Sequence, residues 1–177
     1  RSFSRYCIRN KIISINPAKT LTTPKLDKPL PSFLTQEQTE MLYNGYHNTL
    51  TDLRNSAIIE LFYGSGIRLE ELHSLNTNNI DFKNRLVKVL GKGKKERIIP
   101  ITDTAIDYIE KYLSSKKFKK KGSAPLFVSN RNTRISNRQI ERIVQSEIKK
   151  VSQQKKKSPH VLRHSYATHL LDEGADI

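Results

Sequence analysis

The spacing of apolar residues in this chain changes from helical to strand-like and back, and this change constrains the fold more than any other feature. Apolar side chains recur at helical spacing in five stretches: 52–64, 68–75, 103–115, 137–151 and 159–173. In between they alternate with a period of two, in three short runs: 80–82, 86–90 and 97–99. Runs this short, joined by a turn and a glycine-containing loop, predict an antiparallel meander. We therefore predict a mainly α fold with one small three-stranded antiparallel sheet, in the α+β class.

The first 34 residues differ in character from the rest. Residues 1–11 alternate basic and apolar side chains, as one amphipathic helix would, and four prolines follow at positions 17, 24, 29 and 31. Since proline fixes φ and removes a backbone donor, this stretch predicts an extended linker. Thr35 and Gln38 then fit a capping box, which marks a helix start. We expect three parts: the tail of a preceding helical domain (1–13), a linker (14–34) and a compact domain (35–177).

Charge is the unusual bulk property of the chain. It has 32 Lys and Arg residues against 17 Asp and Glu residues, which gives a formal net charge of +15. Such an excess attracts polyanions and favours phosphate backbones, although a lysine-rich surface that only aids solubility is the alternative. The single cysteine, Cys7, excludes an internal disulfide framework, so we expect a reducing cytoplasm. No apolar run approaches the length of a membrane span, and no signal peptide is visible.

The first candidate site residue is Arg68, which follows the glycine-containing turn Gly64-Ser65-Gly66-Ile67 at a predicted helix start. There the first helical amides and a guanidinium fork point together, an arrangement that suits a phosphate oxyanion. The alternative is a surface arginine paired with a carboxylate such as Glu71, which is the commoner situation for an arginine considered alone.

The second candidate is Lys92, which stands between two glycines in the loop that joins two of the predicted strands. Missing side chains let a loop backbone approach a ligand closely. Considered alone, however, a lysine in a hairpin is usually only solvated. The chain contains no G-x-x-x-x-G-K-[ST] motif, which excludes a nucleotide-binding P-loop.

The third candidate is the pair His160 and Arg163, three residues apart at the start of the last predicted helix. Ser158 is the expected N-cap, and Pro159 takes the first helical position. At this spacing the two side chains share one face, and four residues are expected to face the core: Leu162, Tyr166, Ala167 and Leu170. His160 and His164 have metal-ligand spacing but lack a carboxylate base and a third ligand, so we expect no metal. A histidine that only makes a cap contact is the remaining alternative.

These pieces occur in the order Arg, Lys, His-x-x-Arg, and each resembles a motif of the tyrosine recombinases, the family of lambda integrase and the Xer proteins. Residues 65–72 (SGIRLEEL) resemble the first arginine box of that family. Residues 91–100 (GKGKKERIIP) are similar to the lysine-bearing hairpin of its Xer-like branch, and residues 158–171 (SPHVLRHSYATHLL) to the second arginine box. The spacing also fits, with 24 residues from Arg68 to Lys92 and 68 from Lys92 to His160.

The resemblance implies a tyrosine recombinase catalytic-domain fold and site-specific DNA recombination through a 3′-phosphotyrosyl intermediate, with no metal or other cofactor. It implies that Arg68 and Arg163 bind the non-bridging oxygens of the phosphate in the transition state. Lys92 would protonate the departing 5′ oxygen, and His160 would act as a base or hydrogen-bonding partner near the nucleophile.

The resemblance also implies partners. These are double-stranded DNA and, for the full-length protein, other recombinase protomers in a tetramer on paired sites. We expect further DNA contacts from four basic residues: Lys94, Lys95, Arg134 and Arg138. A location in the cytoplasm, at the nucleoid and away from membranes, follows from that role.

The end of the chain departs from the family pattern. The family places a further His or Trp and then the nucleophilic tyrosine beyond the second arginine box, and neither follows before Ile177. Seven tyrosines are present, none in that context, and Tyr166 is expected to pack in the core. We therefore expect a catalytic domain that is incomplete at its C-terminus and inactive in cleavage by itself.

Two other functions remain as alternatives. One is a naturally tail-less relative, or a partner of a recombinase, that binds DNA without cutting it. All four basic residues of the catalytic type are present, which favours the enzyme, because DNA binding alone does not require Lys92 or His160. The other is an RNA-binding or ribosomal-type protein, which explains the charge but not the ordered motifs.

Overall fold

The computed structural model describes residues 2–21, 32–43, 49–91, 93, 95–115 and 123–175. Backbone contacts divide the chain into two compact units, Arg1–Leu30 and Pro31–Ile177. The first unit contains helix α1 (Ser2–Arg9), on which Cys7 is buried. This helix is shorter than the predicted 1–11, because Lys11 takes a left-handed backbone conformation with φ of 57°.

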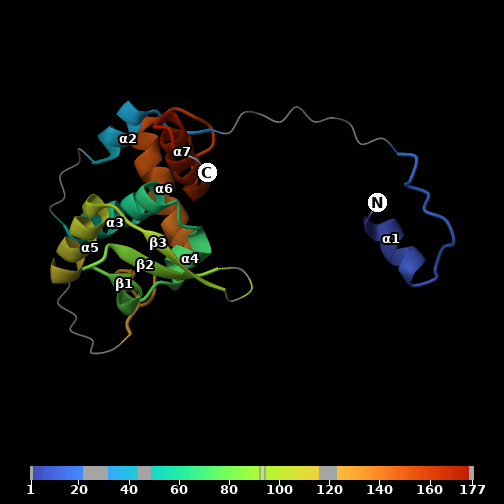
Figure 1. The fold of residues 1–177 in the computed structure, drawn as a ribbon, viewed down its shortest axis with the longest axis horizontal. Coiled ribbons are helices and arrows are strands. Elements are labelled where there is room, and N and C mark those ends of the chain that lie inside the picture. The colour runs from blue at the N-terminus through green and yellow to red at the C-terminus, as the bar shows by residue number, and fades with distance from the viewer. Residues whose placement is uncertain are drawn as a thin grey trace. The chain divides into compact units, whose positions relative to one another are not determined.

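The second unit is mainly helical and carries one small sheet, as predicted (Figure 1). Its elements follow in chain order: α2 (Gln36–Tyr43), α3 (Leu50–Ser65), α4 (Leu69–Ser74), the 3-10 helix η1 (Thr77–Asn79), β1 (Ile80–Asp81), β2 (Leu86–Leu90), β3 (Glu96–Pro100), α5 (Asp103–Ser115), α6 (Asn137–Val151) and α7 (Pro159–Asp172). The predicted bounds of α5 and α6 are confirmed, and α7 ends one residue earlier than predicted. Among the described residues, no helix has the length and apolar composition of a membrane-spanning segment.

Helix α3 forms the centre of the core and packs against both α5 and α7. Ile58, Leu61 and Phe62 on this helix are fully buried. Each such side chain contributes about 1.5–3 kcal/mol when it is removed from water. Because α7 packs on this helix, the two segments that carry the candidate arginines are held close to one rigid element.

The sheet has the predicted order β1-β2-β3 with antiparallel pairing throughout. Val87 and Val89 of β2 are buried, and β2 contacts α4. Figure 1 shows the sheet below α3 and beside α4, with α6 and α7 above α3. On β3 the alternation places Arg97 and Ile99 half-buried on one face, whereas Ile98 is exposed. The sheet therefore presents one arginine toward α4.

The predicted start of α3 at Asp52 is two residues late and its predicted end at Gly64 is one residue early, and capping explains both differences. The Asp52 amide donates a hydrogen bond to the Thr49 hydroxyl at 3.1 Å, and the Thr49 amide donates one to the Asp52 carboxylate at 3.2 Å. Asp52 is thus the third helical residue of a capping box, and the helix begins at Leu50. At the other end Gly66, with φ of 57°, forms the left-handed C-cap.

The predicted core face of α7 is correct only at Leu162, which is fully buried. Tyr166, Ala167 and Leu170 are only half-buried. The buried face instead contains five residues: Pro159, Val161, Leu162, Ser165 and His169. The polar residues on this face have partners, since the hydroxyl of Ser165 and the ring of His169 are both hydrogen-bonded.

The beginning of the second unit is attached to α7. The Leu34 amide donates to the Ser165 hydroxyl at 2.8 Å, and that hydroxyl donates to the Val161 carbonyl at 2.9 Å. The side chain of Leu34 is fully buried. Leu34, one residue before the predicted boundary at Thr35, therefore packs with this unit.

Candidate active site

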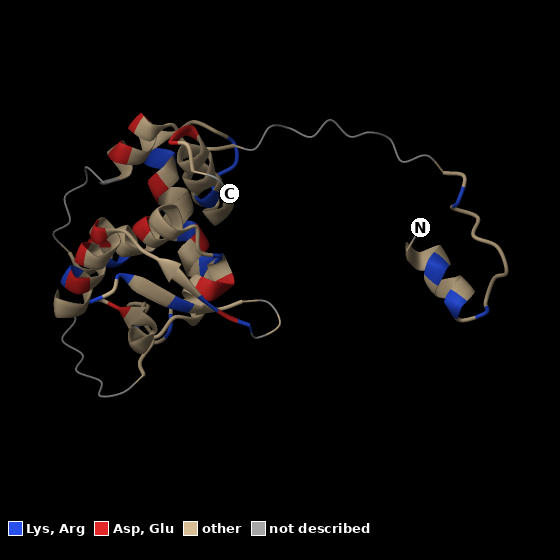
Figure 2. Ribbon diagram, in the orientation of Figure 1, with Lys and Arg blue, Asp and Glu red and all other residues tan. Residues whose placement is uncertain are grey.

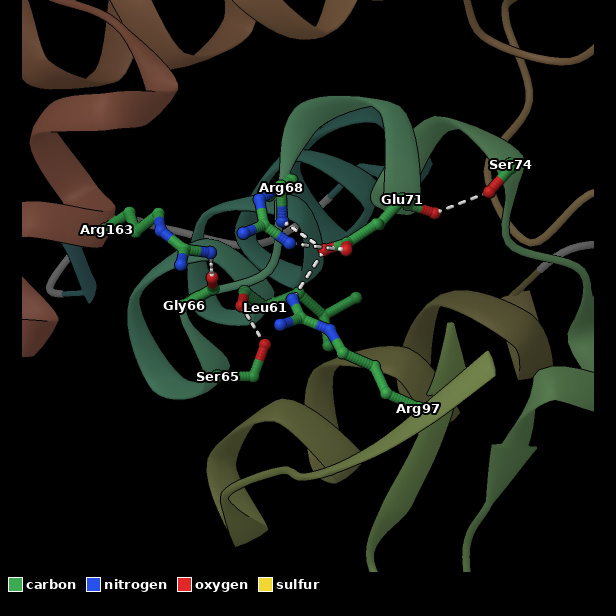
Figure 3. Close-up of polar contacts among 8 residues, drawn as sticks. All are labelled: Leu61, Ser65, Gly66, Arg68, Glu71, Ser74, Arg97 and Arg163. Atoms are coloured by element: carbon green, nitrogen blue, oxygen red, sulfur yellow. Dashed lines mark hydrogen bonds and ion pairs between the residues drawn. The ribbon is translucent and has the colours of Figure 1, made fainter. Parts of the chain in front are cut away.

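Arg68 is the N-cap residue of α4 rather than part of its first turn. Its amide donates to Glu71 Oε2 at 2.8 Å, and its Nη1 donates to Glu71 Oε1 at 3.1 Å (Figure 3). The pairing that we considered as the alternative for Arg68 is therefore present. It is not a surface pair, however, because the side chain of Glu71 is only 2% exposed while that of Arg68 is 57% exposed. The ion pair fixes one edge of the guanidinium and leaves the rest accessible.

Glu71 is held from a second side by the sheet. Arg97 Nη2 on β3 donates to Glu71 Oε2 at 2.8 Å. Burial works to raise the pKa of Glu71, but hydrogen bonds from the amide and guanidinium of Arg68, and then the charge and hydrogen bond of Arg97, lower that pKa below its ordinary value. The buried carboxylate is thus ionised and joins two elements that are distant in sequence.

Arg163 reaches the same region from α7 (Figure 3). Its Nη1 donates to the carbonyl of Gly66, in the turn that precedes Arg68. That turn is packed closely against α7, since a Cβ at Gly66 would lie 2.9 Å from Cδ1 of Tyr166. Burial first, and then the positive charges of Arg68 and Arg97, lower the pKa of Arg163. An arginine stays protonated in such surroundings, so the region concentrates positive charge.

A pocket of about 610 Å³ opens where these elements meet. Arg68, His160 and Arg163 all line it, and so does Gly91 at the end of β2. His160 is exposed on the first turn of α7. The structure therefore brings three of the four predicted catalytic residues to one cavity, although 95 positions separate Arg68 from Arg163.

The fourth predicted residue, Lys92, and the predicted DNA contact Lys94 lie outside the described residues. The described neighbours show the base of their loop, where the Gly91 amide donates to the Lys95 carbonyl at 2.8 Å. Lys95 is exposed. A Cβ at Gly91 would lie 3.7 Å from Glu71 Oε1, so the loop begins beside the buried carboxylate.

The remaining predicted DNA contacts, Arg134 and Arg138, have different surroundings. Arg138 is exposed on the first turn of α6. Arg134 is half-buried, and its guanidinium donates to the carbonyls of His73 and Leu75 and to Oδ1 of Asn76 at 2.5–2.9 Å. Arg134 therefore has a definite role in the fold, and its contact with DNA stays a prediction.

Glu71 and Arg97 are site residues that the motifs did not predict. A signal for Arg97 exists in the strand pattern, because its position shares a face with the half-buried Ile99. An arginine on the inner face of a strand needs a buried acceptor. Glu71, three residues after Arg68 in the same motif, is the acceptor that it finds.

None of the described tyrosine side chains lines this pocket. The ring of Tyr166 lies against Gly66 and is half-buried, so the prediction that Tyr166 packs in the core is wrong. Tyr112 is in the core, and the Tyr63 hydroxyl is hydrogen-bonded to His169 Nδ1 at 2.9 Å. Within the described part of the chain, no three His, Cys, Asp or Glu residues are grouped as metal ligands.

Comparison with known proteins gives consistent matches. The sequence model of the phage integrase family matches residues 32–177. The chain is 45% identical to tyrosine recombinase XerC of Thermodesulfovibrio yellowstonii and 39% identical to tyrosine recombinase XerD of Oceanobacillus iheyensis. Both alignments cover all of this chain and 61% of the other protein. The chain thus spans about 60% of the length of the curated relatives that it matches.

Solved structures agree with the predicted fold. The crystal structure of XerA recombinase is similar with a TM-score of 0.73 at 30% identity, over 94% of this chain and 58% of that chain. The integrase of the transposon Tn1549, solved in complex with transposon right end DNA, gives a TM-score of 0.76 at 21% identity, over 97% of this chain and 64% of that chain. At the lower identity the likeness shows the fold alone.

Proposed function

Since this chain belongs to the phage integrase family, we propose that it is the phosphate-activating part of a site-specific DNA recombinase that cuts and rejoins strands through a phosphotyrosyl intermediate. The observation that carries the proposal is the pocket that Arg68, His160 and Arg163 line together. A site that only attracts DNA needs positive charge, whereas this one gathers two guanidinium groups and a histidine around one pocket of about 610 Å³.

The two arginines would stabilise the transition state. Attack on a DNA phosphodiester concentrates negative charge on the two non-bridging oxygens. Guanidinium groups that are held in place before the reaction lower the energy of that charge more than mobile ones do. Arg68 is held by Glu71, and Arg163 is held by the Gly66 carbonyl. Both therefore meet the requirement for preorganisation.

The other two residues would move protons. We assign to Lys92 the protonation of the departing 5′ oxygen, on the basis of the hairpin motif in which it stands. We assign to His160 the role of a base or hydrogen-bonding partner of the attacking hydroxyl, because it is exposed at the mouth of the same pocket.

We propose that the nucleophilic tyrosine does not belong to these 177 residues. The support is that the described tyrosine side chains do not line the pocket, and that the chain spans only about 60% of its relatives. Residues 1–13 are then the tail of a preceding core-binding helical domain, residues 14–34 are a linker, and residues 35–177 form most of the catalytic domain. The family's assembly, a tetramer of protomers on paired sites, is part of the same proposal.

The partner that we propose is double-stranded DNA, and the place of action is the nucleoid. The +15 charge supports a binding energy dominated by phosphate contacts. If about five phosphates are neutralised, the logarithm of the binding constant falls with the logarithm of salt at a slope of roughly −4 to −5. A flat salt titration would remove this part of the proposal.

A nicked suicide duplex tests the cleavage. The 177-residue chain should bind this duplex without a covalent adduct, while the whole protein should form a denaturation-resistant adduct without added metal. Lys92→Ala in the whole protein should slow cleavage of the normal substrate and be rescued in part by a 5′-thiolate leaving group, which needs no proton. A whole protein that binds tightly and never cleaves would instead identify a non-cleaving relative, and an adduct on the 177-residue chain would refute the missing nucleophile.

A further inference from the structure

Arg97 lies beside the pocket without lining it. Its Nη2 donates to Glu71 Oε2 at 2.8 Å, whereas Arg68 and Arg163 line the cavity. We infer that Arg97 is a positioning residue for the proposed strand cleavage and acts through Glu71 on the guanidinium of Arg68. The inference rests on the proposed function and adds to it a residue whose role is distinct from binding the phosphate.

The carboxylate of Glu71 is shared between α4 and the sheet (Figure 3). Its Oε1 accepts Arg68 Nη1 at 3.1 Å, and its Oε2 accepts both the Arg68 amide and Arg97 Nη2, each at 2.8 Å. One of the three donors therefore comes from β3. Without Arg97, the two donors that remain of these three would both belong to Arg68.

Arg97 comes from the sheet, a different element from the helix that Arg68 caps. On β3 it is paired with Val89 of β2, which is 2% exposed. Helix α4 has only six residues, and a helix of that length depends on outside contacts for its stability. The ion pair between Arg97 and Glu71 therefore holds the start of α4, and with it Arg68, at a fixed place relative to the sheet.

Charge gives a second reason for the role of Arg97. A buried carboxylate needs compensation from nearby cations. With Arg97 sharing that task, Arg68 makes a single side-chain hydrogen bond to Glu71 and remains 57% exposed. If Arg97 is removed, Arg68 becomes the principal cation on Glu71, and a two-pronged pair with the carboxylate is the favoured geometry. That movement would turn the guanidinium away from the phosphate.

The face of the sheet provides a matched control. Lys88 on β2 pairs with Glu96 on β3 at 2.7 Å, and both side chains are more than half exposed. Lys88→Met removes the same unit charge from the same sheet, but from an ion pair that does not contact Glu71. Exposed pairs of this kind contribute little to stability.

The experiment is a single-turnover cleavage assay on the whole protein with a suicide duplex, together with measurement of DNA affinity and thermal unfolding. Arg97→Met should lower the cleavage rate by roughly tenfold to a hundredfold, since displacements of about 1 Å have effects of that size. DNA affinity should change by less than about threefold, because most phosphate contacts remain. Arg97→Lys keeps the charge and should recover part of the rate, and Lys88→Met should cleave like the wild type.

A double-mutant cycle distinguishes positioning from a general loss of stability. If Arg97 acts through Arg68, adding Arg97→Met to Arg68→Ala should cause little further loss of rate. Equal losses in both backgrounds, an unchanged rate in Arg97→Met, or the same loss in Lys88→Met would overturn the inference while the proposed function stands. A wild-type protein that forms no adduct would overturn both, so the two failures are distinguishable.

Discussion

Two groups of arginines lie on this unit, and they differ in what their guanidinium groups contact. Around the candidate site, Arg68 and Arg97 share one buried carboxylate, and Arg163 donates to one backbone carbonyl. Around the loop at 128–135, Arg54 and Arg134 donate to backbone carbonyls and to Asn side chains, and none of these acceptors is a carboxylate. Arg134 reaches the carbonyls of His73 and Leu75, and Arg54 reaches the carbonyl of Val128 and two Asn side chains.

The difference shows how acceptors decide the role of an arginine. A guanidinium has five N–H donors. Among the described residues, Arg134 donates two hydrogen bonds from Nη1 and one from Nη2, all to the segment from the end of α4 to the start of η1. Arg68 uses only Nη1. Arg134 therefore stabilises the fold, whereas Arg68 keeps N–H donors available for a ligand. Figure 2 adds that the acidic residues of α2 lie at the end of the unit away from the hairpin.

The largest expected effect concerns the candidate site. In the whole protein, Arg68→Ala or Arg163→Ala should lower the single-turnover cleavage rate by roughly 10²–10³, the usual loss for one preorganised oxyanion donor. DNA affinity should weaken far less, since each arginine is one of many phosphate contacts. If filter binding and cleavage assays show equal losses of DNA affinity and cleavage rate, then Arg68 and Arg163 only bind DNA and have no separate role in the reaction.

The second effect is one of stability and belongs to the other group. Arg134→Ala removes hydrogen bonds to the His73 and Leu75 carbonyls and to Oδ1 of Asn76. The Leu75 carbonyl keeps the Leu126 amide as a donor, but the loss of the other bonds should still cost about 2 kcal/mol of unfolding free energy. Arg131→Ala, an exposed neighbour in the same loop, is the control and should stay within about 0.5 kcal/mol. Urea unfolding of the 177-residue chain measures both. If Arg134→Ala is as stable as the control, the contacts of Arg134 are not structural.

A third effect concerns the pH dependence that Glu71 confers. Its pKa in the folded chain lies below the ordinary value of 4.5, so its stabilising contribution is complete above that pH and is lost as the pH falls through the folded pKa. The difference in unfolding free energy between the wild type and Glu71→Gln should therefore shrink below about pH 4.5. A difference that stays constant from pH 7 to pH 3 would mean that folding does not lower the pKa of this carboxyl.

The smallest effect sharpens the contrast between Arg138 and Arg134. Arg138 is exposed, so Arg138→Ala should leave stability unchanged and reduce the salt slope of DNA binding by about one, as expected for the loss of one phosphate contact. Arg134→Ala in a fully folded sample should leave the slope nearly unchanged. The reverse outcome in a salt titration would assign the DNA contact to Arg134.

Much of the fold could be predicted because its signals are local. The period-two runs predicted the sheet order, and the apolar spacing predicted the bounds of α5 and α6. The two ends of α3 were missed because Thr49 and Gly66 compete with equally plausible caps nearby. The buried face of α7 was missed because Ser165 and His169 are polar, and only their partners in other segments make burial acceptable.

The sequence by itself determined the family and the order of the motifs, and it marked Arg68, His160 and Arg163 as candidates, since these are properties of residue type and spacing. Only the tertiary structure decided what each charged side chain contacts. Glu71 is a buried carboxylate with a second cationic partner because β3 places Arg97, 26 positions away in sequence, within hydrogen-bonding distance of it. Arg134 stabilises the fold because its guanidinium lies within hydrogen-bonding distance of the carbonyls at the end of α4. A hydrogen bond acts over about 3 Å, so its partner is set by how distant segments pack.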